Sequence, residues 1–397
     1  MLAKKYQEML SAKSVIRSLS EYATERGKQI GYENVFDYSL GNPSVEVPQS
    51  YTDTLIAMLR DENSMALHGY SPTLTIPAVR EAVAENLNRR FGMNYQKEHI
   101  FMVSGAAGAI AHAIRLVTSP GDEILTFAPF FPEYHPYVDL SGACLRVVPA
   151  HTEDFQIHFE AFDAMMNERV MAVLINTPNN PSGVVYSAQT LQHLSAYLHE
   201  KQEEYGHEIY LISDEPYREI AFDGKSVPYP ANYYENTITC YSWSKSLSVP
   251  GDRIGYVAVH PACPDAELMI QMCGQISRGI GHNCPTAMVQ LAVAKNLDAV
   301  ADLSVYETNR NILYDELVSL GFTVVRPAGT FYIFPKALEE DAVSFCEKAK
   351  KYDLILVPGD SFGCPGYFRM AYCIDTEKVE RSLDALRRFV REEYQSS

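Results

Sequence analysis

The stretch CYSWSKSLSVPGDRIGYVAV, residues 240–259, sets Lys245 between two serines and places Arg253 eight positions later. Most lysines are solvated surface charges. This one stands in a segment with few other charges, between two apolar runs that are typical of strands in a buried sheet. An amine in such a place can form a Schiff base with a carbonyl compound, and a nearby arginine can hold an anion.

Two serine chemistries compete with this interpretation. Ser242 and Lys245 match the S-x-x-K motif of acyl-enzyme serines, but the chain has neither the S-D-N nor the K-T-G partner. GDSFG at 359–363 fits the nucleophile elbow of α/β-hydrolases, which needs a helix directly after the serine and a later histidine. The following CPGYFRMAY predicts a turn and a strand, and no histidine occurs after His282. The sequence therefore argues against a hydrolase.

Other polar residues follow apolar runs in the same way. SGAAGAI at 104–110 ends a predicted strand and begins a helix with small residues, so that backbone N–H groups can face an anion. NTPNNPSG carries Asn180, whose amide can donate to a ring oxygen. ISDEPYREI ends a predicted strand in Asp214, with Tyr217 three residues later. An acid in this position can also cap the next helix.

The elements that must position these residues alternate along the chain. The apolar runs HIFMVSG, DEILTFAP, VMAVLINTP, IYLISDEP, TITCYSW and GYVAV mostly end at a polar or turn residue, and helical stretches at 106–118 and 187–204 separate several of them. This pattern predicts an α/β fold with a mainly parallel sheet covered by helices. The polar residues then gather at the carboxyl ends of the strands, where such sheets place their sites.

The pattern changes after about residue 285. A long helical region is followed by TFYIFPK, a helix near 340–351, LILVPG, YFRMAYC and a final helix, which together predict a smaller α+β unit. A chain of 397 residues also exceeds the usual limit of a single core. We expect a large cofactor-binding domain at 48–310 and a small domain formed by 1–47 and 311–397.

Two further helices are predicted near the N-terminus. Residues 11–30 are predicted to form an amphipathic helix whose apolar face carries Val15, Ile16, Leu19 and Tyr22. Pro77 begins a second helix and Gly92 ends it.

Composition excludes several classes of partner. The net charge of −17 argues against nucleic acid, since phosphate binding needs a basic face. No apolar run approaches the roughly 20 residues of a membrane span, and the first residues lack the apolar block of a signal peptide, so we expect a cytoplasmic protein without membrane association. Eight cysteines without a C-x-x-C pair and eleven scattered histidines predict no metal site.

The order of the motifs GNP, SGAAGAI, PFFPEY, NNPSG, SDEPY, SWSK…R and FRMAY resembles the class I/II aminotransferase family, pyridoxal-5′-phosphate (PLP) enzymes of fold type I. The resemblance covers almost the whole chain. It implies an aspartate aminotransferase-like fold, PLP as the cofactor, and a homodimer with shared active sites.

The resemblance also assigns the residues around the cofactor ring. Lys245 binds the cofactor aldehyde and then carries the catalytic proton. The carboxylate of Asp214 keeps the ring nitrogen protonated, so that the ring can act as an electron sink. Tyr217 and Asn180 donate to the ring 3-oxygen, and Phe131 stacks on the ring face. The groups expected at the phosphate are the backbone of Gly105, Ala106 and Ala107, the side chains of Ser242 and Arg253, and Tyr70 of the neighbouring subunit.

Substrate recognition follows from the same comparison. Arg369 in YFRMAY corresponds to the arginine that binds the α-carboxylate, and Gly41 to the loop that closes over it. Arg278, five residues before Asn283, resembles an arginine that enters from the partner subunit and binds a side-chain carboxylate. Aspartate or glutamate with 2-oxoglutarate is thus the leading substrate pair.

Other functions stay open at this stage. GIGH replaces the bulkier family residues after Arg278, and Tyr70, Phe130, Phe131 and Tyr134 also suit an aromatic side chain. An aromatic or broad-specificity aminotransferase is therefore an alternative. A PLP-dependent C–S lyase uses nearly the same residues. A non-catalytic regulator of this fold is expected to carry a DNA-binding module and a basic face, which this acidic chain lacks.

Overall fold

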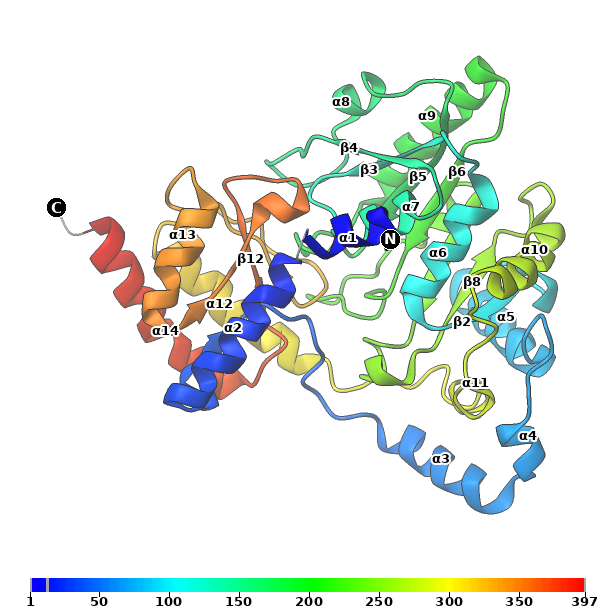
Figure 1. Cartoon of the computed structure of the whole chain (residues 1–397), viewed down its shortest axis with the longest axis horizontal. Coiled ribbons are helices and arrows are strands. Elements are labelled where there is room, and N and C mark those ends of the chain that lie inside the picture. Colours follow the sequence, from blue (N-terminus) through cyan, green and yellow to red (C-terminus); the bar gives the residue numbers. More distant parts are fainter. Residues whose placement is uncertain (1, 12–13, 396–397) are drawn as a thin grey trace.

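The computed structural model describes residues 2–11 and 14–395, and Figure 1 shows the path of the chain. Its α-helices are α1 Lys4–Ser11, α2 Val15–Ile30, α3 Gln49–Asp61, α4 Ser64–His68, α5 Pro77–Phe91, α6 Gly105–Val117, α7 Tyr134–Asp139, α8 Phe159–Asp163, α9 Ala188–Tyr205, α10 Ala266–Gly279, α11 Ala287–Ala294, α12 Ser304–Ser319, α13 Ala342–Ala349 and α14 Thr376–Val390. Its strands are β1 Phe36–Asp37, β2 Ile100–Val103, β3 Glu123–Phe127, β4 Cys144–Val148, β5 Val170–Asn176, β6 Tyr210–Asp214, β7 Thr237–Ser242, β8 Gly255–Val259, β9 Tyr332–Ile333, β10 Leu354–Ile355, β11 Val357–Pro358 and β12 Phe368–Ala371. No helix of the described segments is both long and apolar enough to cross a membrane.

A seven-stranded sheet in the order β2-β8-β7-β6-β5-β3-β4 forms the centre of the larger unit. Every strand pair in it is parallel except those that involve β8. Strands β7 and β8 are buried along their whole length and β6 is buried after its first residue, because helices cover the sheet (Figure 1). The predicted mainly parallel α/β fold and the six strands expected from the sequence are confirmed.

Strand β4 was missed by the sequence analysis because it lies at the edge of the sheet and carries a charge. Its residues CLRVV are only partly buried. Arg146 in its middle donates to Glu123 Oε2 on the adjacent strand at 2.7 Å. A charged residue in the middle of a short apolar run hides the strand pattern, although such residues are common on edge strands.

The smaller unit contains the three-stranded antiparallel sheet β11-β12-β9, packed with α12, α13 and α14. The chain before α3 joins it, since β1 pairs in parallel with β10 and the hydroxyl of Tyr38 lies 2.6 Å from Ser382 Oγ. GDSFG forms a short 3₁₀ turn, Gly359–Phe362, and leads to β12 rather than to a helix. The domain boundaries 48–310 and 1–47 plus 311–397 stay a prediction.

The helix expected at 11–30 is shorter than predicted. Helix α2 begins at Val15, residue 11 belongs to the separate helix α1, and residues 12 and 13 lie outside the described segments. On α2 the buried positions are Leu19, Ala23 and Gly27, spaced four residues apart, whereas Val15 and Tyr22, which we had placed on the apolar face with Ile16, are exposed. The buried face of α2 is thus formed by Leu19 together with the small residues Ala23 and Gly27, and not by Val15 and Tyr22.

Helix α5 begins at Pro77 as predicted and ends before Gly92, whose φ of 68° is left-handed. Glycine adopts this conformation without steric cost. The buried residues of α5 include Val79, Val83 and Leu87, which are spaced four residues apart in the sequence and so lie on one face of the helix.

Strand register brings the functional residues to one edge of the large sheet. Asn176 is the last residue of β5 and is the direct neighbour of Asp214, the last residue of β6. Ser242 ends β7, two residues further along than Cys240, the partner of Asp214. The carboxyl ends of three parallel strands therefore carry an amide, a carboxylate and a hydroxyl side by side.

Candidate active site

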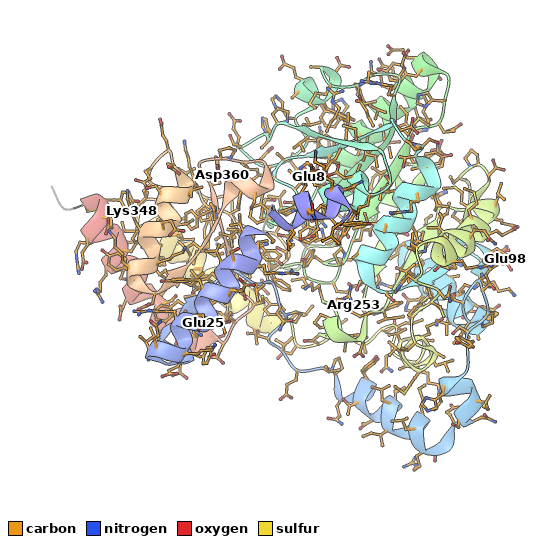
Figure 2. All side chains as sticks on the ribbon, in the orientation of Figure 1. Glu8, Glu25, Glu98, Arg253, Lys348 and Asp360 are labelled. Carbon is orange, nitrogen blue, oxygen red and sulfur yellow. The ribbon has the colours of Figure 1, made fainter. Side chains whose placement is uncertain are left out.

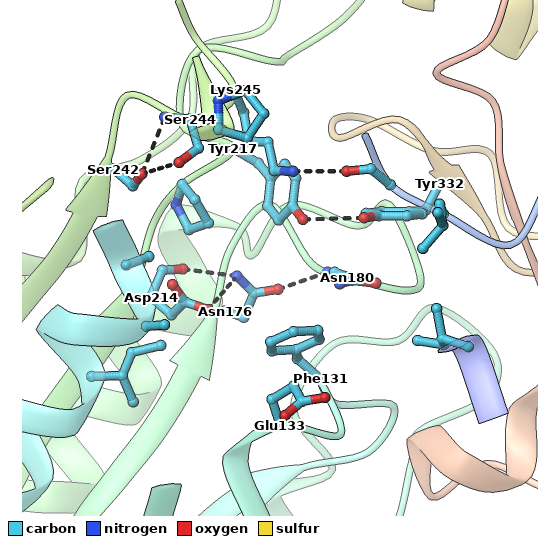
Figure 3. Close-up of a pocket in the computed structure, with 18 of the residues that line it drawn as sticks. Phe131, Glu133, Asn176, Asn180, Asp214, Tyr217, Ser242, Ser244, Lys245 and Tyr332 are labelled. Atoms are coloured by element: carbon cyan, nitrogen blue, oxygen red, sulfur yellow. Dashed lines mark hydrogen bonds between the residues drawn. The ribbon is translucent and has the colours of Figure 1, made fainter. Parts of the chain in front are cut away.

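A cavity of about 600 Å³ lies at this edge, between the large sheet and the smaller unit. Figure 3 shows its walls, and Figure 2 places Arg253 near the middle of the molecule. Most residues predicted from the sequence line it together: Gly41, Ala106, Ala107, Phe131, Asn180, Asp214, Tyr217, Ser242, Lys245, Arg253 and Arg369. Gly105 lies next to this wall, one residue before Ala106.

Lys245 follows β7 and crosses the cavity. Its Nζ donates to the backbone oxygen of Gly41 at 2.8 Å and lies 5.3 Å from the ring centre of Phe331 (Figure 3). Burial lowers the pKa of Lys245 to about 8, and the positive charges of Arg253 and Arg369 act in the same direction. The amine therefore loses its proton more easily than an ordinary lysine, and the neutral form is the nucleophile.

Asp214 is a buried carboxylate with two different oxygens. Oδ2 accepts a hydrogen bond of 2.6 Å from the hydroxyl of Tyr134, and the amide of Asn176 donates to the backbone oxygen of Asp214 at 2.9 Å. Oδ1 is buried and has no partner among the described residues. Burial raises the pKa of Asp214 to about 7, although the bond from Tyr134 lowers it. This oxygen can accept a hydrogen bond from a ligand.

Asn176 and Asn180 of NTPNNPSG connect Asp214 to Arg369. Oδ1 of Asn176 accepts from the backbone N–H of Asn180 at 2.7 Å, and Oδ1 of Asn180 accepts from Arg369 Nη1 at 3.1 Å. Arg369 is only 2% exposed and lies over the ring of Tyr332, with its guanidinium carbon 4.6 Å from the ring centre. Its Nε is buried without a partner among the described residues, and Nη2 donates to the backbone oxygen of Ser39. This cation is held in a fixed position and can bind an anion.

Aromatic rings form the remaining walls around the ring-sized space. The ring of Phe131 packs edge-on against Tyr134, with 5.7 Å between the ring centres. The hydroxyl of Tyr217 lies 3.3 Å from that of Tyr332 (Figure 3). Gly41 passes so close to Tyr332 that a Cβ there would stand 1.7 Å from its hydroxyl oxygen. Only glycine therefore fits at this point of the loop.

Arg253 and the start of α6 form a cradle with positive charge. Arg253 has a left-handed φ of 53°, and its Nη1 donates to the backbone oxygen of Pro250 at 2.9 Å. A Cβ on Gly105, whose φ is 75°, would lie 2.8 Å from Arg253 Nη2. Both the conformation and the space require glycine here, and the backbone N–H groups at the start of α6 can face an anion.

Two predicted residues lie outside this cavity. Tyr70 is 99% exposed, and Arg278 lies exposed near the end of α10, where its Nη1 is 3.5 Å from Gln275 Oε1. Both were expected to enter the site of a neighbouring subunit, so their roles stay predictions.

Sequence reasoning missed several residues that line the cavity: Arg17, Glu133, Tyr137, Asn176 and Tyr332. It named Tyr134 only as a possible neighbour of an aromatic substrate. Asn176 ends an apolar strand just as Asp214 does, and this position was a usable signal. Tyr134 belongs to the PFFPEY motif, but nothing in the sequence indicated its bond to Asp214. No group of three or more potential metal ligands occurs among the described residues.

The family model of the class I and II aminotransferases matches residues 33–386. The chain belongs to the class I and II aminotransferase family. Members of the aspartate aminotransferase type use PLP, and the chain is accordingly a PLP-dependent aminotransferase, an enzyme of the transferase class. This result supports the aminotransferase interpretation over the regulator and the C–S lyase.

Relatives of known structure or name have a similar length and fold. A solved structure of an amino transferase from Eubacterium rectale is 42% identical, with a TM-score of 0.96, and the match covers 99% of this chain and 100% of that one. An aspartate aminotransferase from Thermotoga maritima is 25% identical with a TM-score of 0.86, covering 98% and 100%. An aromatic-amino-acid aminotransferase from Thermococcus litoralis is 28% identical over 91% and 93% of the two chains.

The cavity of this aminotransferase fits PLP on structural grounds. A buried carboxylate oxygen without a partner suits a protonated ring nitrogen, and the cradle of Gly105 and Arg253 suits a phosphate. Lys245 supplies an amine that is partly neutral, and Phe131 supplies a flat wall. The carboxylate, the phosphate cradle, the amine and the aromatic wall thus meet in one cavity, as PLP binding requires.

Replacing Asp214 by Asn is expected to stabilise the ligand-free protein at alkaline pH, because an amide carries no charge to bury. The carboxyl pKa is about 7 in the folded chain and about 4 when unfolded. Between these values the folded state binds an extra proton, so wild-type stability falls as the pH rises from about 4 to about 7. Urea unfolding of ligand-free wild type and Asp214→Asn at about pH 5 and about pH 8 measures how the free energy of unfolding of each protein changes with pH. The same change in both proteins would contradict the prediction.

Proposed function

We propose that the enzyme moves the amino group of an L-amino acid to a 2-oxo acid with Lys245 as the catalytic base. The observation that carries this proposal is the position of the Lys245 amine across the same cavity from the unpartnered Oδ1 of Asp214. When bound, PLP supplies an electron sink for the pair of electrons left at the substrate α-carbon. Every other step depends on groups of this chain.

In the proposed mechanism Lys245 would hold the cofactor through Nζ and would act as the base when that amine is free. Burial lowers the pKa of Lys245, so that Nζ can take the proton from the substrate α-carbon near neutral pH. Asp214 would hold the proton of the ring nitrogen, and Tyr134 and Asn176 keep its carboxylate in position. Asn180 and Tyr217 would donate to the ring 3-oxygen.

The remaining groups hold the two anions. Arg253, Ser242 and the backbone of residues 105–107 bind the phosphate. Arg369 would bind the α-carboxylate, because its buried guanidinium lines the cavity and its Nε has no partner among the described residues. Gly41 allows its loop to pass close to Tyr332 beside that carboxylate.

Aspartate or glutamate with 2-oxoglutarate is the proposed substrate pair. Aspartate aminotransferases are among the relatives, including one from Pyrococcus abyssi that is 28% identical over 96% of both chains. An aromatic substrate is the second candidate, because Phe131, Tyr137 and Ile16 line the same cavity and the relative from Thermococcus litoralis is named for aromatic amino acids.

A homodimer with shared active sites is part of the proposal. An exposed tyrosine, Tyr70, follows the exposed side chains of Ile56, Leu59 and Met65 on α3 and α4, and burial of such a surface favours association. The expected cytoplasmic location also stays a prediction.

Borohydride reduction of the PLP-loaded enzyme, followed by peptide mapping, is expected to find the cofactor attached to Lys245. Reduction fixes a Schiff base as a stable amine, so the labelled peptide identifies the lysine. The matched variant Lys245→Ala should take up no label. Label on a different lysine would refute the assignment.

Steady-state kinetics are expected to give a kcat/KM for aspartate at least about tenfold above that for phenylalanine, since one charged pair with a second carboxylate is worth roughly this factor. Equal values, or a preference for phenylalanine, would support the aromatic candidate instead.

Co-expression of the Lys245→Ala and Tyr70→Ala chains tests the shared site. A mixed dimer contains one site with both substitutions and one site with neither. Activity of the mixture should therefore exceed that of either variant alone. The absence of such a gain, with mixed dimers verified by mass spectrometry, would mean that each chain builds its site alone.

A further inference from the structure

One cation that lines the cavity has no task in the mechanism above. Lys245, Arg253 and Arg369 act on the cofactor, the phosphate and the α-carboxylate. Arg17, in the first turn of α2, lines the same cavity together with Ser14, and it serves none of these groups.

Arg17 also lacks an internal partner. Among the described residues it makes no hydrogen bond or ion pair, whereas the other cations of α2 do: Arg26 Nε lies 2.7 Å from Asp353 Oδ1, and Lys28 Nζ lies 2.6 Å from Glu25. The far end of α2 is thus held to the smaller unit by Arg26, while Arg17 in its first turn lines the cavity without an ion pair to any described residue. Figure 1 shows α2 beside the smaller unit, with its start towards the centre of the molecule.

We propose that Arg17 binds the distal carboxylate of a dicarboxylic substrate within its own chain. This inference rests on the proposed aspartate or glutamate specificity. Arg369 is committed to the α-carboxylate, so a second carboxylate needs another cation at the cavity wall, and a guanidinium can pair with it through two hydrogen bonds. Arg278, the other candidate, lies outside the cavity of its own chain.

Glu133 restricts where the second carboxylate can lie. It lines the cavity on the loop that carries Phe131, and Figure 3 shows it beside that ring. The negative charge of Glu133 repels a substrate carboxylate on the side of the cavity formed by Phe131 and Glu133. The side of the cavity formed by α2 is then the favourable place for the acidic end of the substrate.

Equilibrium binding of two unreactive acids to the PLP-loaded enzyme tests this role without turnover. Succinate has a second carboxylate, whereas butyrate has the same chain length and only one. In Arg17→Ala, calorimetry should find succinate binding weakened about 10-fold to 100-fold and butyrate binding changed by less than about threefold, as expected for the loss of a charge-assisted pair. The succinate affinity of Arg17→Lys should lie between those of the wild type and Arg17→Ala, because lysine keeps the positive charge but cannot form the two parallel hydrogen bonds of a guanidinium.

Lys28→Ala is the matched control, since it removes a cation from the same helix outside the cavity; it should keep the wild-type ratio of the two affinities. Arg17 is exposed and unpaired, so Arg17→Ala should also keep the wild-type melting temperature. An unchanged succinate-to-butyrate ratio in Arg17→Ala overturns the inference, and a loss confined to Arg278→Ala does the same. A wild-type enzyme that binds both acids equally contradicts the proposed substrate class itself.

Discussion

The structure depends on one buried charge, the carboxylate of Asp214. A carboxylate without full solvation is costly in a protein interior, and here one oxygen is satisfied by Tyr134 while the other has no partner among the described residues. The cost is tolerated because the neighbouring groups hold the carboxylate towards a space that a cation-like ring can fill. The same burial that raises its pKa makes a protonated ring nitrogen a favourable ligand.

The contacts on the opposite face of strand β6 hold the strand end that carries the Asp214 carboxylate. Successive side chains of an extended chain point to opposite faces, and the residue after Asp214, Glu215, forms a buried ion pair with Arg218 at 2.8 Å. The guanidinium of Arg218 lies over the rings of Phe91, Tyr229 and Tyr241 at 4.5–5.2 Å from their centres. The ion pair and the aromatic packing on this face anchor the end of the strand that carries Asp214 on its other face.

Part of the site could be predicted because the carboxyl ends of parallel strands lie at one edge of the sheet. A polar residue at the end of an apolar run marks the carboxyl edge of the sheet, and this rule located Asp214, while the glycine-rich helix start located Gly105. The family resemblance assigned Ser242, which also ends a strand. What could not be predicted depends on contacts between distant segments. Tyr332 comes from a two-residue strand of the smaller unit. Arg17 belongs to a helix whose predicted apolar face was partly wrong, because small residues rather than large ones make its contacts.

The position of Arg17 and Arg369 shows why the two ends of the chain must fold together. Arg369 lies on β12 near the C-terminal end, and the segment around Ser39 that receives its hydrogen bond lies near the other end. Pairing of β1 with β10 and the contact of Tyr38 with Ser382 hold these segments in one unit. Arg369 and Arg17 are therefore carried by the same unit, whereas Asp214 and Lys245 belong to the large sheet and the segment after it. All four residues line one cavity, so the interface between the two units forms part of the candidate site.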